Sequence, residues 1–277
     1  MSSTDDSAFG SDLTTRFVAG LVMILVACGA TYYGGWPFRL LVAAAAAVMV
    51  VEWSDMHKAA RHWAYACAGL VAIVLLAGSA YLFPLADDNL AAIDSGLLQP
   101  VPFAVGAAIA TALLLGAVTR RLSMAWGVLY IALPAFALIV LDWIWFELVF
   151  WAFVVTWSTD IFAYFAGRAI GGPKLAPRIS PNKTWAGLAG GVIGAGVAGA
   201  LVASMLDLGA PYTFVGGLMG VIAQAGDLFE SWIKRRAGVK DSGSILPGHG
   251  GVLDRLDGLL AVVVATFALL AWGLVTA

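Results

Sequence analysis

Long apolar segments separated by short polar ones run along nearly the whole chain. A helix that crosses a bilayer needs about 17–25 mostly apolar residues, and segments of that length recur from residue 17 onwards. The fifth and sixth segments are separated only by residues 142–147, and the eighth runs into polar residues before it ends. The pattern predicts an all-α, polytopic integral membrane protein with about nine transmembrane helices, at residues 17–35, 38–54, 64–83, 101–118, 124–142, 145–166, 186–206, 212–233 and 256–276.

The composition agrees with lipid as the main solvent of this chain. Of its 277 residues, 61% are hydrophobic and only 12% are charged, whereas soluble domains carry about 25% charged residues. The mean hydropathy is +0.92. Cys28 and Cys67 both lie in apolar segments, which indicates small buried side chains and not a disulfide. Residues 1–12 are polar and acidic and lack the order of a cleaved signal peptide, so we expect a short flexible tail there.

The basic residues are distributed unevenly between the two sides that nine spans define. The side with the N-terminal tail and the even-numbered loops receives fourteen of the fifteen, and the other side keeps only Arg39, along with Asp87, Asp88, Asp94 and Asp207. Basic residues accumulate on the cytoplasmic side of membrane proteins. We therefore predict a cytoplasmic N-terminus and an external C-terminus, with the large basic loops facing the compartment that contains nucleotides.

The segment 231–257 concentrates the polar chemistry of the chain. Acidic residues and three glycines around His249 are interleaved there with a third of all basic residues. Cations suit phosphates, carboxylates suit a metal ion, and glycines permit close backbone approach, so this segment favours chemistry on a polyphosphate. Its basic residues are Lys234, Arg235, Arg236, Lys240 and Arg255.

The eighth predicted helix carries a polar stripe. Acidic groups inside a span are costly and usually face a partner, an aqueous cavity or a substrate, and a solvated helix end is the plainer alternative. Asp254 and Asp257, spaced i and i+3 as the ninth helix begins, are expected to face the same cavity. Two carboxylates from separate helices, together with substrate phosphates, are a usual way to hold Mg²⁺. The stripe is spaced i, i+3, i+4, i+7 and consists of Asp227, Glu230, Ser231 and Lys234.

A second candidate site precedes the seventh span. Ser180 is a good N-cap and Pro181 a good first helical residue, which would put Lys183 in the first turn of the helix. A helix N-terminus with a lysine beside it binds anions. Capping alone explains Ser180 and Pro181, so only Lys183 and Thr184 ask for a further role.

Two other patterns have a structural alternative. Asp160, Tyr164 and Arg168 lie on one side of the sixth span, where neutralisation of the aspartate by the arginine competes with a functional role. Residues 194–199 match G-x-G-x-x-G, but they lie inside an apolar helix and not after a strand, so they indicate close helix packing.

The C-terminal half resembles the phosphatidate cytidylyltransferases, or CDP-diacylglycerol synthases. The signature runs from Ser231 to Asp257 as S-x-I-K-R, K-D, P-x-H-G-G and D-R-x-D, and every position of it is filled. Residues 224–231 (Q-x-G-D-x-x-E-S), 180–184 (S-P-x-K-T) and 160–168 (D-x-x-A-Y-x-x-G-R) also look like family motifs. Ala186 departs from the pattern, because members often carry a glutamate there. The N-terminal half is similar in hydropathy only.

The resemblance implies an enzyme, a nucleotidyltransferase of phospholipid biosynthesis that joins CTP and phosphatidate to give CDP-diacylglycerol and pyrophosphate. It implies Mg²⁺ as cofactor, with K⁺ as a second candidate ion, and membrane lipids and a second copy of the chain as partners, but no nucleic acid. It also implies an inner (plasma) membrane location. The chain then divides into a cytoplasmic tail (1–16), a lipid-facing scaffold of N-terminal helices (17–142) and C-terminal helices with the catalytic site (143–277).

The site residues implied by the resemblance fall into three sets. The metal ligands are Asp227 and Asp254, followed by Asp257 and Asp241. The catalytic residues are Asp227, Lys240, Asp254 and Lys183. The substrate-binding residues are Ser180, Lys183, Thr184, Ser231, Lys234, Arg235, Lys240, His249 and Arg255.

Two alternatives remain from the sequence. A related cytidylyltransferase using another lipid phosphate, of the archaeol type, would share the same motifs. An anion transporter is the alternative from a different class, but transporters usually show broken helices near the midplane and similar halves, which this chain lacks.

Overall fold

The computed structural model describes residues 5–82, 100–246 and 250–276 as eight helices and two short strands. The helices dominate, so the predicted all-α membrane class is confirmed in its main feature. The strands form one small antiparallel hairpin. In chain order the elements are α1 (Asp5–Tyr33), α2 (Gly35–Met56), α3 (Arg61–Leu82), α5 (Pro100–Thr119), α6 (Leu122–Ile170), β1 (Lys174–Ala176), β2 (Ser180–Thr184), α7 (Trp185–Met205), α8 (Ala210–Ala237) and α9 (Leu253–Thr276).

Helix α6 is the centre of the bundle. It packs against α1, α2, α3, α5, α7, α8 and α9. Its buried residues all lie between Met124 and Thr159, as expected for an apolar stretch in the middle of a bundle. Trp145 departs from helical geometry, with φ −151° and ψ 95°, and divides the 49 residues into two helical stretches. This kink falls at the first residue of the sixth predicted span, so the fifth and sixth predicted spans are two parts of one element.

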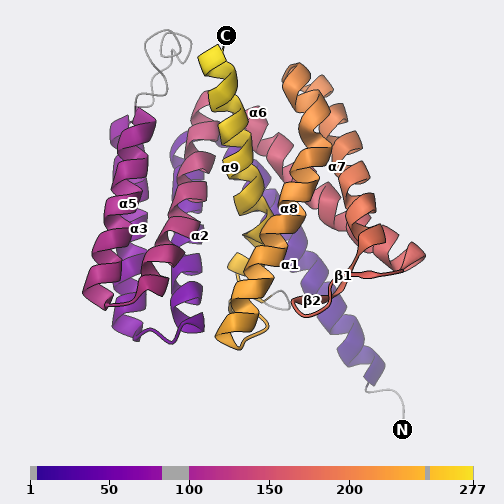
Figure 1. The fold of residues 1–277 in the computed structure, drawn as a ribbon, viewed down its shortest axis with the longest axis horizontal. Coiled ribbons are helices and arrows are strands. Elements are labelled where there is room, and N and C mark those ends of the chain that lie inside the picture. The colour runs from indigo at the N-terminus through magenta and orange to yellow at the C-terminus, as the bar shows by residue number, and fades with distance from the viewer. Residues whose placement is uncertain (1–4, 83–99, 247–249, 277) are drawn as a thin grey trace.

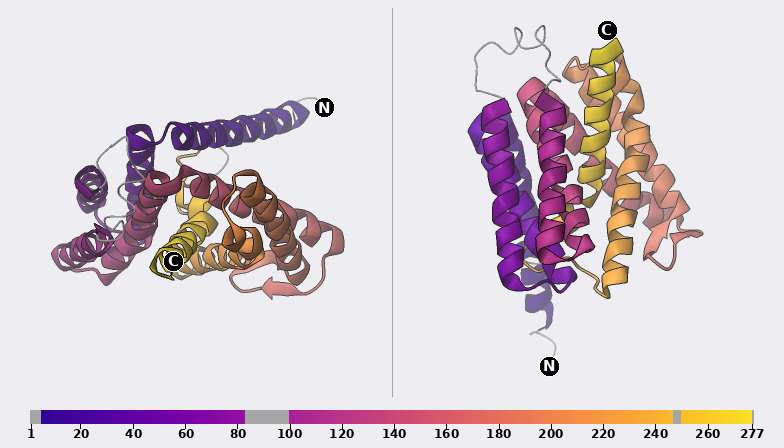
Figure 2. Two further views of the ribbon diagram at one scale, coloured as in Figure 1. Left: turned by 90° about the horizontal axis from the view of Figure 1, so that it is seen from above. Right: turned by 60° about the vertical axis from the view of Figure 1, so that its left-hand side comes forward.

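Two groups of helices flank α6 (Figure 1). On one side α3 packs against both α2 and α5, and on the other α8 packs against both α7 and α9. Seen from above, α1 runs along the outside of the bundle (Figure 2). In Figure 1, α1 begins at the lower end of the bundle and α9 ends at the upper end. The two ends of the described chain therefore lie on opposite sides.

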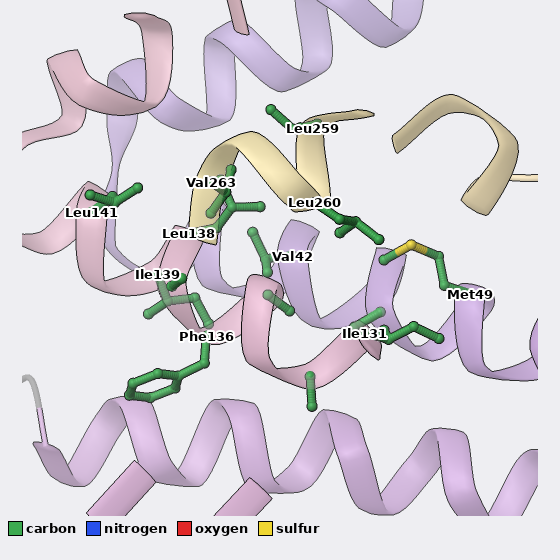
Figure 3. Close-up of a cluster of buried hydrophobic side chains, with 14 of the residues drawn as sticks. Val42, Met49, Ile131, Phe136, Leu138, Ile139, Leu141, Leu259, Leu260 and Val263 are labelled. Carbon is green, nitrogen blue, oxygen red and sulfur yellow. The ribbon is translucent and has the colours of Figure 1, made fainter. Parts of the chain in front are cut away.

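A buried hydrophobic cluster joins α2, α6 and α9 (Figure 3). In a membrane such contacts stabilise by close packing and not by exclusion of water. Helices α2 and α9 both pack against α6 there, which matters for the site described below. Its labelled members are Val42, Met49, Ile131, Phe136, Leu138, Ile139, Leu141, Leu259, Leu260 and Val263.

Glycines bring α6, α7 and α8 close together, which confirms the packing interpretation of residues 194–199. A Cβ atom on Gly194 would lie 2.4 Å from the ring of Phe162, and one on Gly216 would lie 2.7 Å from the carbonyl oxygen of Ala195. The carbonyl of Gly199 also accepts a hydrogen bond of 2.9 Å from the indole of Trp151.

The helix start predicted at Ser180 is wrong. Ser180 to Thr184 form strand β2, paired with β1 through Lys174–Thr184 and Ala176–Ser180, and α7 begins at Trp185. Proline disfavours helical geometry in the residue before it, so Ser180 stays extended. The N-cap is Thr184, whose hydroxyl accepts a hydrogen bond of 3.0 Å from the backbone N–H of Gly187. Lys183 therefore lies on a strand and not in a helical turn.

The predicted count of nine spans is not confirmed. Six helices of the described chain are long and apolar enough to cross a membrane: α2, α3, α5, α6, α7 and α9. Helix α6 counts once despite its kink, the apolar part of α1 covers only residues 18–33, and α8 falls outside the six.

The flexible tail expected at residues 1–12 is also wrong from Asp5 onwards, where α1 begins. The polar composition of these residues leaves no apolar period from which a helix could be predicted. The division of function at residues 142 and 143 stays a prediction, and α6 runs through that boundary.

Candidate active site

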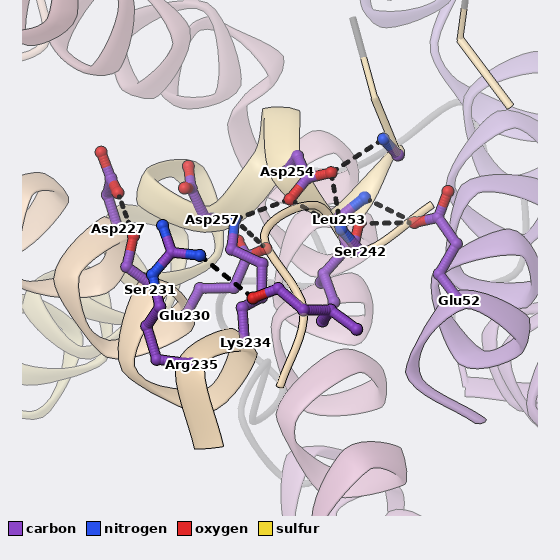
Figure 4. A network of polar contacts seen from close by, with 12 residues as sticks. Glu52, Asp227, Glu230, Ser231, Lys234, Arg235, Ser242, Leu253, Asp254 and Asp257 are labelled. Carbon is purple, nitrogen blue, oxygen red and sulfur yellow. Dashed lines mark hydrogen bonds and ion pairs between the residues drawn. The ribbon is translucent and has the colours of Figure 1, made fainter. Parts of the chain in front are cut away.

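The polar stripe of α8 lies on one face of the helix, as its spacing predicts (Figure 4). The hydroxyl of Ser231 donates to Oδ1 of Asp227 at 3.3 Å. One turn further, Nζ of Lys234 lies 3.1 Å from Oε1 of Glu230. Because α8 packs against α9, this face points at the start of the last helix.

Lys234 joins α8 to the first turn of α9. Its ammonium donates to Oδ1 of Asp254 at 2.6 Å while contacting Glu230. Glu230 is fully buried, and neither of its carboxylate oxygens accepts a hydrogen bond of good geometry among the described residues. The contact between Lys234 and Glu230 is therefore one of charge without hydrogen-bond alignment. A buried carboxylate without such partners is costly, and only the nearby cation offsets the cost here.

Asp254 organises the loop that precedes α9. Its carboxylate accepts the backbone N–H of Ser242 at 2.9 Å and that of Gly251 at 2.8 Å, in addition to the bond from Lys234. A Cβ atom on Gly250, whose φ is +81°, would lie 2.9 Å from Oδ2 of the same carboxylate. Both oxygens of Asp254 are thus engaged by protein donors.

The hairpin β1–β2 delivers Lys183 to the same face of α8. The ammonium of Lys183 lies 2.5 Å from Oδ2 of Asp227 and donates to Oε1 of Gln224 at 2.8 Å. Arg235 of α8 also contacts the hairpin. Its guanidinium donates to the carbonyl of Ile179, just before β2, and to the carbonyl of Val239. The candidate site at residues 180–184 and the polar stripe of α8 therefore form one site.

Asp257 and Asp160 complete a group of carboxylates from three helices. The charge of Asp227 acts on both of them, and Lys183 and Arg255 act on Asp160. Among the described residues Asp160 and Arg168 form no ion pair, so the neutralisation considered for that pair is not observed. Oδ1 of Asp257 accepts the backbone N–H of Gly258 at 2.7 Å.

The remaining predicted residues lie around this group in different ways. Lys240 and Asp241 are exposed on the loop after α8, and Arg255 is exposed on the first turn of α9. Ser180 is half-buried in β2, and Thr184 is buried with its hydroxyl used as the cap of α7. His249 lies outside the described residues.

The comparisons with known proteins agree with this geometry. A sequence model of the cytidylyltransferase family matches residues 14–272. The chain belongs to the cytidylyltransferase family. It is 41% identical over 258 residues to a phosphatidate cytidylyltransferase of Brucella abortus, covering 91% of this chain and 90% of the relative. A protein of the same name from Pseudomonas aeruginosa is 36% identical over 285 residues, covering 94% and 97%. One from Bacillus subtilis is 48% identical over 126 residues, covering 44% and 47%.

Membership of the cytidylyltransferase family confirms the resemblance and the nucleotidyltransferase class that the motifs predicted. The match extends well into the N-terminal half, where the motifs gave no signal. That half contributes a site residue that the sequence interpretation missed. Glu52 of α2 is buried and accepts hydrogen bonds from the loop before α9. An acidic residue inside an apolar segment was the available signal.

Proposed function

We propose that this cytidylyltransferase transfers the cytidylyl group of CTP to phosphatidate, giving CDP-diacylglycerol and pyrophosphate at the cytoplasmic face of the inner membrane. One observation carries the proposal. Lys183 of the hairpin reaches Asp227 of α8 at 2.5 Å, and Lys234, two turns along the same helix, is 2.6 Å from Asp254 of α9. Three separate segments thus bring paired cations and carboxylates to one polar face within an apolar protein.

The reaction needs positioning more than a protein nucleophile. A phosphatidate oxygen attacks the α-phosphorus of CTP, the bond to the β,γ-pyrophosphate breaks, and pyrophosphate leaves in line. Both substrates are anionic, so cations must hold them together before attack. Lys183 is already directed at the carboxylate group, and Lys240, Arg255 and Arg235 are exposed around it. These four side chains are the proposed phosphate ligands.

The predicted magnesium site is best supported at Asp227 and Asp257. Among residues 5–82, 100–246 and 250–276, no three acidic, histidine or cysteine side chains are placed to form a complete metal site. Mg²⁺ needs few protein ligands when substrate phosphates supply the rest. The mutual repulsion of Asp227, Asp257 and Asp160 is what a divalent cation would relieve. When bound, the ion would neutralise charge on the triphosphate.

Asp254 and Asp241 fit the metal less well. Asp254 would have to release backbone N–H groups and Lys234 to bind an ion, and Asp241 is exposed on the loop. We propose that Asp254 acts by holding the loop and Lys234 in place.

Labelled CTP tests the reaction directly. Purified protein in detergent is incubated with phosphatidate and Mg²⁺ and with CTP labelled with ³²P at either the α or the γ position. Chloroform-soluble product is expected to carry label from the α position only. Label from the γ position would identify a kinase, and no lipid label with phosphatidate but clear label with an archaeol-type lipid phosphate would reassign the acceptor. Failure with every lipid phosphate would contradict the proposal.

A further inference from the structure

A carboxylate from the N-terminal half is built into the loop between α8 and α9. Glu52, on the last turns of α2, is only 5% exposed. Its Oε1 accepts the backbone N–H of Val252 at 2.8 Å, and its Oε2 accepts that of Leu253 at 2.9 Å. Figure 4 shows Glu52 approaching the loop from the side opposite Asp227. These contacts join residues about two hundred positions apart in the chain.

The loop is shaped to receive this carboxylate. A Cβ atom on Gly243 would lie 2.8 Å from Oε1 of Glu52, and one on Gly251 would lie 2.8 Å from the same oxygen and 2.1 Å from Oγ of Ser242. Side chains at either glycine would displace Glu52. The hydroxyl of Ser242 contacts Oε2 at 3.4 Å. The site is therefore enclosed by the loop and is not an accidental surface contact.

Helix α2 holds Glu52 at a fixed position. The neighbouring Trp53 donates from its indole to the carbonyl of Ser123 at 2.9 Å. The same indole covers Gly127 of α6, where a Cβ atom would lie 2.2 Å from it. Because the end of α2 is anchored to α6 in this way, the loop must adjust to Glu52 and not the reverse.

Glu52 and Asp254 accept hydrogen bonds from different backbone N–H groups of the loop. Asp254 accepts the N–H groups of Ser242 and Gly251, and Glu52 accepts the next two N–H groups, at the start of α9. Charged acceptors at a helix N-terminus satisfy backbone donors that have no partner within the helix. Together the two carboxylates hold two segments in place. These are the first turn of α9, which carries Arg255, and the part of the loop that follows Lys240.

We propose that Glu52 is a positioning residue for the reaction: its carboxylate, anchored on α2, sets the placement of the first turn of α9 and so of Asp254 and Arg255. The inference rests on the proposed function for its effect on turnover, but not for its effect on the loop. It gives the N-terminal helices a part in catalysis beyond that of a lipid-facing scaffold.

The test compares Glu52→Gln with Asp55→Asn. Both remove one negative charge from the end of α2, but Asp55 is exposed. Glutamine has one acceptor oxygen, and its NH₂ group would oppose a backbone N–H, so one of the two bonds must break. We expect amide hydrogen exchange at residues 250–256 to accelerate about tenfold in Glu52→Gln, the usual scale for losing a bond to a charged group. Exchange in α7 should be unchanged, and Asp55→Asn should match the wild type throughout.

Kinetics distinguish positioning from general stability. In Glu52→Gln, kcat/KM for CTP should fall about tenfold. The melting temperature of this variant should stay near that of Asp55→Asn. If Glu52→Gln does not fold, Glu52→Asp keeps the charge with a shorter reach and should show a smaller acceleration confined to the same residues. Wild-type exchange and wild-type kcat/KM in a folded Glu52 variant would overturn the inference. Exchange that changes as expected in a protein that does not use CTP would overturn only the proposed function.

Discussion

At the scale of single residues, Asp227 is the carboxylate that joins the hairpin to α8. It receives Ser231 and Lys183 and repels Asp257. Asp227→Asn keeps the side-chain volume but removes the charge that would hold Mg²⁺ and orient Lys183. We expect activity to fall about 10²-fold, as for loss of an electrostatic element of an active site. Asp207→Asn, at an exposed position before α8, should leave the rate unchanged. Near-normal turnover in Asp227→Asn would remove this residue from the metal site.

Lys183 tests the role of the hairpin as a carrier of charge. Lys183→Ala removes the ion pair to Asp227 and a phosphate ligand, so the rate with CTP and phosphatidate should fall by about tenfold or more. Added Mg²⁺ should not restore it, because the ion cannot replace a cation delivered by β2. Lys174→Ala is the matched control, since Lys174 is exposed on the partner strand. Full recovery at high Mg²⁺ would show that Lys183 only balances the carboxylates.

At the scale of elements, the close approach of α8 and α9 depends on Gly226. A Cβ atom there would lie 2.7 Å from the carbonyl oxygen of Asp257 and 2.8 Å from Cβ of Ala261. Gly226→Ala should therefore separate the two helices, lower the melting temperature and reduce activity. Gly217→Ala on the same helix meets atoms only at 3.4 Å and beyond, so it should be neutral or stabilising by about 0.5–1 kcal/mol from helix propensity. Thermal unfolding in detergent compares the two variants, and equal effects would contradict this account.

The sequence predicted those elements that depend on residues close together in the chain. The stripe on α8 followed from helical spacing alone, and the kink of α6 fell within residues 142–147, where the apolar pattern is interrupted. The hairpin did not follow, because a strand pair of three and five residues is stabilised by pairing across a turn and leaves no apolar period. The contact of Glu52 with Val252 joins residues far apart in the chain, so no local pattern indicates it.

Four basic connections of the described chain lie at the end of the bundle that holds the site (Figure 1). They follow α2, α5, α6 and α8. Arg121 donates to the carbonyl of His57 at 2.8 Å, which joins the connection after α2 to the one after α5. Arg235 donates to Ile179 and so joins the hairpin to the end of α8. From the positive-inside rule we expect this end to face the cytoplasm, where CTP is available.

The position of the C-terminus tests that orientation. Helix α9 begins beside the site and ends at the opposite side of the bundle (Figure 1), so its end should lie outside the cytoplasm if the site lies inside. A phosphatase fused at Ala277 should be active and a fluorescent protein fused there dark, because the first folds outside and the second inside. Fusions at Leu82, the last residue of α3, test a different helix and should agree with an external position. A fluorescent C-terminal fusion would place the end of α9 in the cytoplasm and therefore the site, at the other end of α9, outside it. The site would then face away from the compartment that contains CTP.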